Sequence, residues 1–150
     1  MTTGQIVLLS AVVLALGFGA WRGLRDGRFR GTHEVKGAEA ETVHEPGVLA
    51  GTDIEHTLGE RATLLQFSSA FCAPCRATRR VLGEVAALVP GVAHVEIDAE
   101  HHLELVRRVG VLRTPTTLIL DVDGREVSRA CGTPRRDAVL ATLARVAIPE

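Results

Sequence analysis

The stretch that decides the fold is FCAPC, Phe71 to Cys75, in which a proline stands directly before the second of two cysteines. A CxxC pair can clamp a metal, form a static disulfide or act as a redox couple. With neither a second pair nor suitably spaced histidines, it makes a poor zinc site, because a closed structural site needs four ligands. The chain has three cysteines, and an odd count argues against a fully paired disulfide scaffold.

The residues on either side of the motif alternate between the apolar patterns of strands and of helices. An apolar run of strand length precedes it, and apolar residues recur at helical spacing after it. The expected strands are residues 62–69, residues 92–98 and the two runs around Asp123-Gly124, a favoured hairpin turn. The expected helices are residues 53–60, 75–88, 102–111 and 134–147, the last with Pro134 in its first turn.

From about Val48 to Glu150 the chain resembles the thioredoxin family. The resemblance rests on FCAPC after a buried strand, on Thr114-Pro115 before the hairpin, and on Asp123-Gly124 followed by Cys131-Gly132. It implies a thioredoxin-like α/β fold, with a central mixed sheet flanked by helices, and the activity of a protein disulfide oxidoreductase. It also implies that Pro115 follows a cis peptide bond and lies against the dithiol.

In such a protein the two cysteines have different roles. The attacking species is a thiolate, and the N-terminus of a helix stabilises negative charge. We therefore expect Cys72 to be the exposed nucleophile, and Cys75, further into the helix, to be the buried resolving thiol. The chemistry needs no cofactor beyond the redox-active disulfide Cys72–Cys75. The alternative is a static disulfide or a pair of inert core thiols.

The resemblance also implies a substrate groove beside the dithiol. Pro115 would shape this groove, and the backbone of Thr114 could pair with an extended substrate strand. The expected groove residues are Phe71, Ala73, Pro74, Thr114, Pro115, Cys131 and Gly132. Cys131 stands where the family has an apolar residue, so we expect a small hydrophobic contact there rather than a third redox thiol.

Two positions depart from the family pattern in ways that affect proton transfer. Thioredoxins usually carry a buried aspartate on the strand before the dithiol, and here that position is Gln66, which cannot titrate. A buried lysine often partners that aspartate, and its place is taken by His94. Either water or His94 acting through water could then serve Cys75. The simpler interpretation of His94 is a half-buried histidine with a satisfied hydrogen bond.

The N-terminus predicts a membrane anchor over residues 1–21. No charged side chain occurs from Met1 to Trp21, and roughly 20 apolar residues cross a bilayer. Trp21 stands where an interfacial aromatic residue belongs. The alternatives are a cleaved signal peptide, which would want a positive charge before the apolar run, and a buried helix of a soluble protein.

The residues that follow predict the orientation and a tether. Arg22, Arg25, Arg28 and Arg30 follow the apolar run, and basic residues near a span tend to stay in the cytoplasm. We therefore expect a single-pass membrane protein with a cytoplasmic domain; the alternative is an extracytoplasmic one. Residues 22–47 show no sustained apolar period and end in Pro46-Gly47, which predicts a flexible linker before the domain at residues 48–150.

Together these features predict a membrane-tethered protein that reduces protein disulfides and receives electrons from a reductase or another dithiol carrier. One alternative is a thiol–disulfide exchange or maturation factor outside the cytoplasm. Another is a non-enzymatic binding module that uses the same fold. The net charge of −1 gives no basic face for nucleic acid, and the sequence predicts no metal site.

Overall fold

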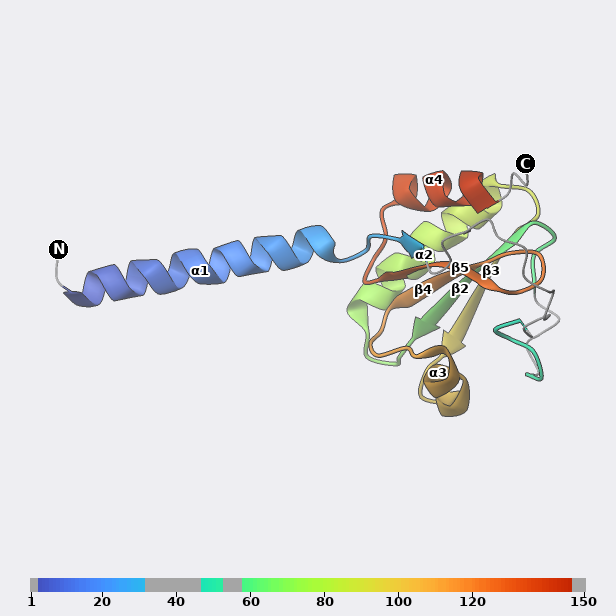
Figure 1. Cartoon of the computed structure of the whole chain (residues 1–150), viewed down its shortest axis with the longest axis horizontal. Helices are drawn as coiled ribbons and strands as arrows, with labels where there is room; N and C mark the ends of the chain where they lie inside the picture. Colours follow the sequence, from blue (N-terminus) through green and yellow to red (C-terminus); the bar gives the residue numbers. More distant parts are fainter. Residues whose placement is uncertain (1–2, 32–46, 53–57, 147–150) are drawn as a thin grey trace, which may run out of the picture.

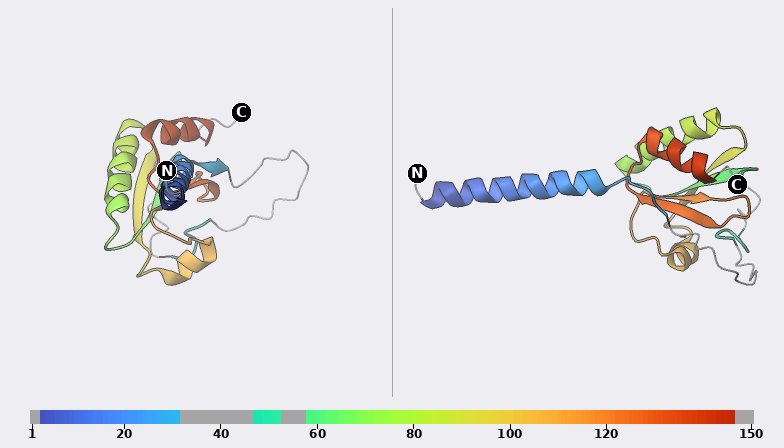
Figure 2. Two further views of the ribbon diagram at one scale, coloured as in Figure 1. Left: turned by 90° about the vertical axis from the view of Figure 1, so that its left-hand side faces the viewer. Right: turned by 45° about the horizontal axis from the view of Figure 1, so that its top comes forward.

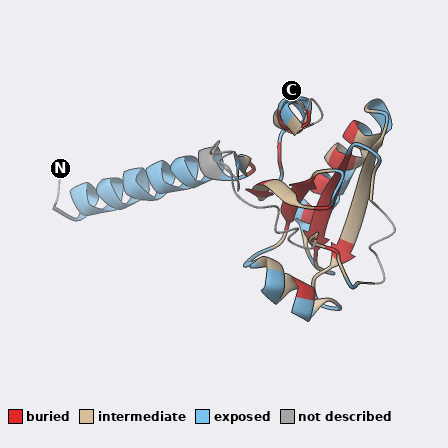
Figure 3. Ribbon diagram, turned by 45° about the vertical axis from the view of Figure 1, so that its right-hand side comes forward, coloured by how far each residue is buried: buried red, intermediate tan, exposed pale blue. Residues whose placement is uncertain are grey.

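The computed structural model describes residues 3–31, 47–52 and 58–146, and shows a long helix joined to an α/β domain (Figure 1). The helix, α1 (Thr3–Arg25), is exposed along Gly4–Gly23 and is long and apolar enough to span a membrane. Figure 3 shows that this segment is exposed and does not pack into the α/β domain. The first five residues of the helix expected at 53–60 lie outside the described residues, and the last three are not helical.

The domain is built on a mixed sheet with the strand order β1-β5-β4-β2-β3. The neighbouring strands β2 (Ala62–Ser68) and β3 (Val92–Asp98) are parallel, and β3 lies at the edge of the sheet. Strand β4 (Thr116–Leu120) runs antiparallel to β2, and β5 (Glu126–Cys131) antiparallel to β4. The expected thioredoxin-like architecture is therefore confirmed, with the predicted hairpin formed by β4 and β5.

Helices cover both faces of this sheet, which is why every residue of β2 and β4 is buried (Figure 3). On one face, α2 (Ala73–Leu88) and α4 (Arg136–Val146) pack Leu82, Val85 and Val139 against the sheet. On the other face, α3 (Leu103–Val109) packs Leu105 against Leu65, Phe67 and Leu118. These two apolar layers hold the end of β2 and the start of α2 in fixed positions.

The last helix begins later than expected. Pro134 was expected in its first turn, but α4 starts at Arg136, and the carbonyl of Arg135 accepts the first helical hydrogen bonds, from Ala138 N and Val139 N. Pro134 is buried in the loop before the helix. Gly27 packs closely against this loop, and a Cβ added to Gly27 would lie 2.2 Å from the carbonyl oxygen of Thr133. Tertiary packing of this loop therefore delays the helix.

The prediction of a linker that begins at Arg22 is wrong for its first ten residues. Helix α1 continues to Arg25, and Asp26 to Gly31, here called the strap, runs along the edge of the sheet. Its last two residues form β1 (Arg30–Gly31), which pairs with Arg129 and Ser128 of β5. An edge strand offers unpaired backbone groups, and β5 uses them to bind this segment. Residues 32–46 lie outside the described residues.

Candidate functional site

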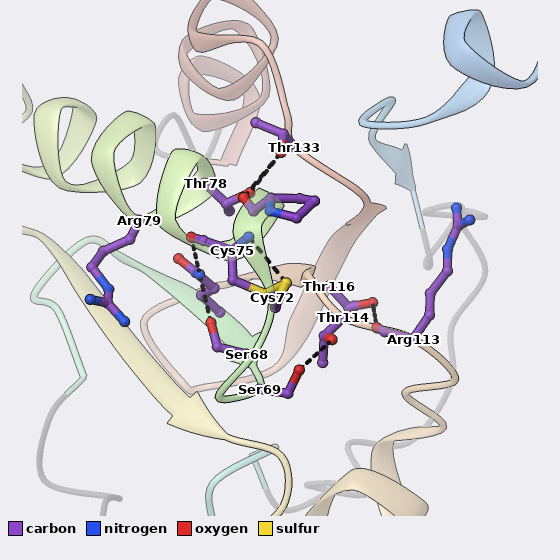
Figure 4. The surroundings of a disulfide bond; sticks show 12 residues. Ser68, Ser69, Cys72, Cys75, Thr78, Arg79, Arg113, Thr114, Thr116 and Thr133 are labelled. Atoms are coloured by element: carbon purple, nitrogen blue, oxygen red, sulfur yellow. Dashed lines mark hydrogen bonds between the residues drawn. A yellow bond between two sulfur atoms is a disulfide. The ribbon is translucent and has the colours of Figure 1, made fainter.

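The two cysteines of FCAPC form a disulfide at the N-terminus of α2, as Figure 4 shows. Their Cα atoms are 5.2 Å apart. Cys72 is the N-cap of α2, and its Sγ accepts a hydrogen bond of 3.1 Å from the backbone N–H of Cys75. Pro74 lies in the first turn, where backbone N–H groups have no partner within the helix, so the absence of an N–H in proline costs no hydrogen bond. In the reduced protein the same N–H and the helix dipole would stabilise a thiolate on Cys72.

The two sulfur atoms differ in their access to solvent. Cys72 is partly exposed, whereas Cys75 is 2% exposed. Both line a cleft of about 440 Å³, together with Ser68, Ser69, Ala70, Arg76, Arg79, Glu96 and Asp98. Cys72 is therefore the cysteine that a substrate disulfide can reach more easily, and Cys75 is the buried one.

The expected groove residues fall into two groups. Phe71 is 99% exposed beside the dithiol. The peptide bond between Thr114 and Pro115 is cis, in agreement with the resemblance. The hydroxyls of Thr114 and Ser69 share a hydrogen bond of 3.1 Å, which ties this loop to the one that carries the cysteines (Figure 4). These residues, with Ala73 and Pro74 in the first turn of α2, surround Cys72.

Cys131 and Gly132, by contrast, are engaged by the strap. The carbonyl of Cys131 accepts a hydrogen bond of 2.6 Å from the N–H of Gly27. A Cβ added to Gly132, whose φ is +87°, would lie 3.2 Å from the Cβ of Asp26. The N–H of Gly132 donates to the carbonyl of Pro115 at 2.8 Å. The strap therefore lies against Cys131 and Gly132, two residues that were expected to line an open groove.

The surroundings of Cys131 are more polar than expected. It is a free, partly exposed cysteine, and the hydroxyl of Thr116 donates to its Sγ at 3.6 Å. Hydrogen bonds to Asp26 and then to the Cys131 thiol raise the pKa of Arg113 above its ordinary value. A cavity of about 320 Å³ adjoins this thiol, lined by Trp21, Arg22, Asp26, Arg28, Arg113, Arg129 and Cys131. Cys131 is therefore not a purely apolar contact.

Gln66 lies directly behind the dithiol and organises its surroundings. It is completely buried, and its amide nitrogen donates to the carbonyl of Cys75 at 3.0 Å and to the hydroxyl of Ser68 at 2.7 Å. The same nitrogen lies 3.3 Å from Oε1 of Glu96. An amide donates these bonds without changing charge, so the position fixes the backbone of Cys75 but cannot accept its proton.

Glu96 is a residue of this cleft that the sequence did not single out. It lines the same cleft as both cysteines and accepts a hydrogen bond of 2.6 Å from Ser68. It also forms an ion pair with Arg79, whose Nη2 lies 2.8 Å from Oε1. Burial opposes its ionisation, but the bonds from Arg79 and Ser68 outweigh burial, so the pKa of Glu96 lies below its usual value. The cleft therefore contains a carboxylate that is ionised at neutral pH.

His94 does not reach the dithiol cleft. Its Nε2 lies 3.2 Å from Oε1 of Gln66, so the buried amide stands between the imidazole and Cys75. Burial is the main cause that lowers the pKa of His94, which keeps the ring neutral at neutral pH. These contacts fit a half-buried histidine that orients Gln66.

Comparisons with known proteins agree with this geometry. The family model described as Thioredoxin matches residues 48–145. A thioredoxin of Chlamydia trachomatis is 26% identical over 98 residues, which are 65% of this chain and 95% of that protein. A thioredoxin of Alicyclobacillus acidocaldarius is 33% identical over 89 residues, which are 59% of this chain and 84% of that protein.

Solved structures resemble the same part of the chain. The thioredoxin of Fasciola hepatica superposes with a TM-score of 0.53 at 26% identity, over 62% of this chain and 86% of that one. A mutant thioredoxin from Halobacterium salinarum gives a TM-score of 0.56 at 23% identity, over 61% of this chain and 79% of that one. At this identity the second likeness shows the fold alone.

Proposed function

Because the chain belongs to the thioredoxin family, we propose that it is a membrane-tethered oxidoreductase that reduces protein disulfides with the Cys72–Cys75 dithiol. The observation that carries this proposal is the difference between the two sulfurs. Cys72 caps α2 and is open to solvent, whereas Cys75 is buried one turn later and bonded to it. This arrangement separates an attacking thiol from a resolving one.

The reaction proceeds by two exchanges of sulfur–sulfur bonds. The Cys72 thiolate attacks one sulfur of a substrate disulfide, the substrate S–S bond breaks, and the released thiolate takes a proton from solvent. Cys75 then loses its proton and attacks Cys72 in the mixed disulfide, which releases the second substrate thiolate. The substrate gains two electrons and two protons, and the dithiol becomes the disulfide. A reductase or another dithiol carrier returns it to the reduced form.

Glu96 is the proposed acceptor for the Cys75 proton. Gln66 occupies the expected site of the base but cannot titrate, and His94 is screened from the cleft by that amide. Glu96 lines the cleft with Cys75, and its lowered pKa keeps the carboxylate ionised at neutral pH, although it also makes the carboxylate a weaker base. Transfer runs directly or through one water in the cleft, and the Ser68 and Arg79 bonds hold the carboxylate in place.

The membrane tether is supported by α1. Its segment Gly4–Gly23 is long and apolar enough to cross a bilayer and is exposed throughout. The arginines that follow it favour a cytoplasmic domain. A cytoplasmic location in turn favours a reductant, because thiols are kept reduced there.

A redox titration of the dithiol tests the activity. We expect a reduction potential near that of thioredoxin, about −270 mV; a value near that of DsbA, about −120 mV, would identify an oxidant instead. The Cys131→Ser variant leaves a single titrating pair and serves as the matched background for Cys72→Ser and Cys75→Ser. If the variant that carries both Cys72→Ser and Cys75→Ser still restores the phenotype of a strain that lacks the gene, the protein is a binding module rather than an enzyme.

The orientation has a separate test. In intact cells, a membrane-impermeant thiol reagent should leave reduced Cys72 unlabelled, and it should label Cys72 once the membrane is permeabilised. Labelling of intact cells would place the domain outside the cytoplasm.

A further inference from the structure

The dithiol and the membrane helix lie at the same end of the domain. The strand registers fix this relationship, because Phe67 near the end of β2 pairs with Thr116, which pairs with Cys131 at the end of β5. The strap binds this end through the N–H of Gly27 and the carbonyl of Cys131. Helix α1 therefore leaves the domain from the end where α2 begins, as Figures 1 and 2 show.

No residue of the chain separates the last helical hydrogen bond of α1 from the first hydrogen bond to the domain. The N–H of Asp26 still bonds to the carbonyl of Arg22 within the helix, and the next residue, Gly27, already bonds to β5. The carboxylate of Asp26 also pairs with Arg113 at 2.8 Å. At about 1.5 Å per residue, Gly23 and Asp26 are only about 5 Å apart along the helix axis. A bilayer around Gly4–Gly23 would thus begin beside the dithiol end.

Two large apolar side chains project from this end. Phe71 is 99% exposed beside Cys72, and Leu112 is 95% exposed on the loop that leads to Thr114 and Pro115. The two side chains lie on the two loops that the hydrogen bond between Ser69 and Thr114 joins, so one apolar partner beside the dithiol can contact both. Isolated apolar residues on other surfaces of the domain, such as Leu88, are about half exposed.

The charges beside these side chains suit a membrane surface. The cavity at the junction of α1 and the domain is lined by Trp21 and by Arg22, Arg28 and Arg113. Asp26, which also lines it, offsets one of these positive charges. Basic side chains next to a span are attracted to anionic headgroups, and tryptophan is enriched at the level of those headgroups.

We propose that the dithiol end of the domain rests on the anionic bilayer surface, with Phe71 and Leu112 at headgroup level. The inference depends on the membrane tether of the proposed function. Cys72 then opens toward the membrane surface rather than toward bulk solvent. The substrate class that follows is a disulfide held at headgroup level by a membrane protein, and large soluble disulfide proteins are hindered.

Tryptophan fluorescence in vesicles tests this orientation. The full chain carries Trp21→Phe, which removes its one native tryptophan, together with either Leu112→Trp or Leu88→Trp. Leu88 ends α2, about 24 Å from the start of that helix at 1.5 Å per residue, and is also exposed. Vesicles contain phosphatidylglycerol and phosphatidylcholine brominated near the top of its acyl chains. Flotation of the vesicles reports whether the chain is anchored.

For the anchored protein we expect bromine to remove most of the Leu112→Trp fluorescence, with a shift of its emission to shorter wavelength, and to leave Leu88→Trp nearly unchanged. Equal quenching at both positions, or none at either, overturns the proposed orientation while the tether stands. A chain that does not float with the vesicles overturns both. Thiol–disulfide exchange with a small soluble disulfide shows that each variant is folded. If Leu88→Trp is inactive in that assay, Val122→Trp replaces it, because Val122 is exposed in the turn at the far end of the sheet.

Discussion

Gln66 and Glu96 lie side by side across the parallel strands β2 and β3, with the amide nitrogen of Gln66 3.3 Å from Oε1 of Glu96. The buried amide binds the carbonyl of Cys75, and the carboxylate lines the cleft that contains its sulfur. Under the proposed function, the positioning of Cys75 and the transfer of its proton are divided between these two residues. The family pattern would place a single titrating aspartate at the position of Gln66.

The first prediction concerns Glu96 as the proton acceptor. Glu96→Gln keeps the shape of the side chain but removes the base, so resolution of the mixed disulfide by Cys75 should slow by on the order of 100-fold near neutral pH. Rapid-quench mass spectrometry of the mixed disulfide measures this step. Asp98→Asn is the matched control. Asp98 lines the same cleft, but its carboxylate is already hydrogen-bonded to the backbone N–H of Glu100 and to the imidazole of His101. Equal rates in the two variants would exclude Glu96 as the base.

The second prediction concerns the buried amide. Gln66→Asp removes the donors to Ser68 and to the carbonyl of Cys75 and places a second carboxyl group beside Glu96. We expect the free energy of unfolding to fall by about 1–3 kcal/mol, because buried acceptors lose their partner. Urea denaturation measures this loss.

Gln66→Met separates the two causes in that experiment, because it removes the hydrogen bonds without adding an acid. The Asp variant should lose additional stability as the pH rises, when both carboxyl groups ionise, and the Met variant should not. Faster resolution by Cys75 in Gln66→Asp would show that the family's base can work here. An unchanged rate would show that this position does not limit the step.

The third prediction is the pH dependence of stability due to His94. Burial lowers the pKa of His94 in the folded state, whereas the unfolded chain protonates near pH 6.5. The unfolded state therefore binds more protons as the pH falls below about 6.5, and the free energy of unfolding should decrease until the folded pKa is also passed. Urea denaturation at a series of pH values measures the slope. In His94→Gln the slope in this window should flatten, and an identical slope in both proteins would assign it to other groups.

The fourth prediction concerns contact between the strap and Gly132. Gly132 and Gly110 both have positive φ, +87° and +70°, so an alanine at either position should cost about 1–2 kcal/mol of backbone strain. Only at Gly132 would the new Cβ meet another segment, at 3.2 Å from Asp26, whereas the space at Gly110 is open. Gly132→Ala should therefore loosen the strap, and Gly110→Ala should not.

Hydrogen exchange of the Gly27 amide measures that loosening, because this amide bonds to the carbonyl of Cys131. We expect faster exchange in Gly132→Ala alone, together with faster alkylation of the Cys131 thiol. The same acceleration in Gly110→Ala would mean that the strap responds to global stability rather than to this contact.

The local chemistry of the dithiol could be predicted from the sequence. The apolar run before FCAPC, the helical spacing after it and the Asp123-Gly124 turn are patterns of neighbouring residues, and the strands and helices follow them closely. The place of Cys72 at a helix N-terminus is likewise a local property. The start of the last helix could not be predicted, because the loop around Pro134 is fixed by its contact with Gly27.

The sequence by itself thus determined the family, the order of the strands and helices from β2 to α4, and which two cysteines form the disulfide, because each depends mainly on local patterns of residues. Only the tertiary structure decided that Glu96 stands next to Gln66 and that the strap joins β5 beside Cys131. Both depend on strand pairing between residues far apart in the chain, and a spacing of residues does not encode which edge of a sheet a segment will occupy. The same pairing brings the dithiol to the end of the domain from which α1 departs.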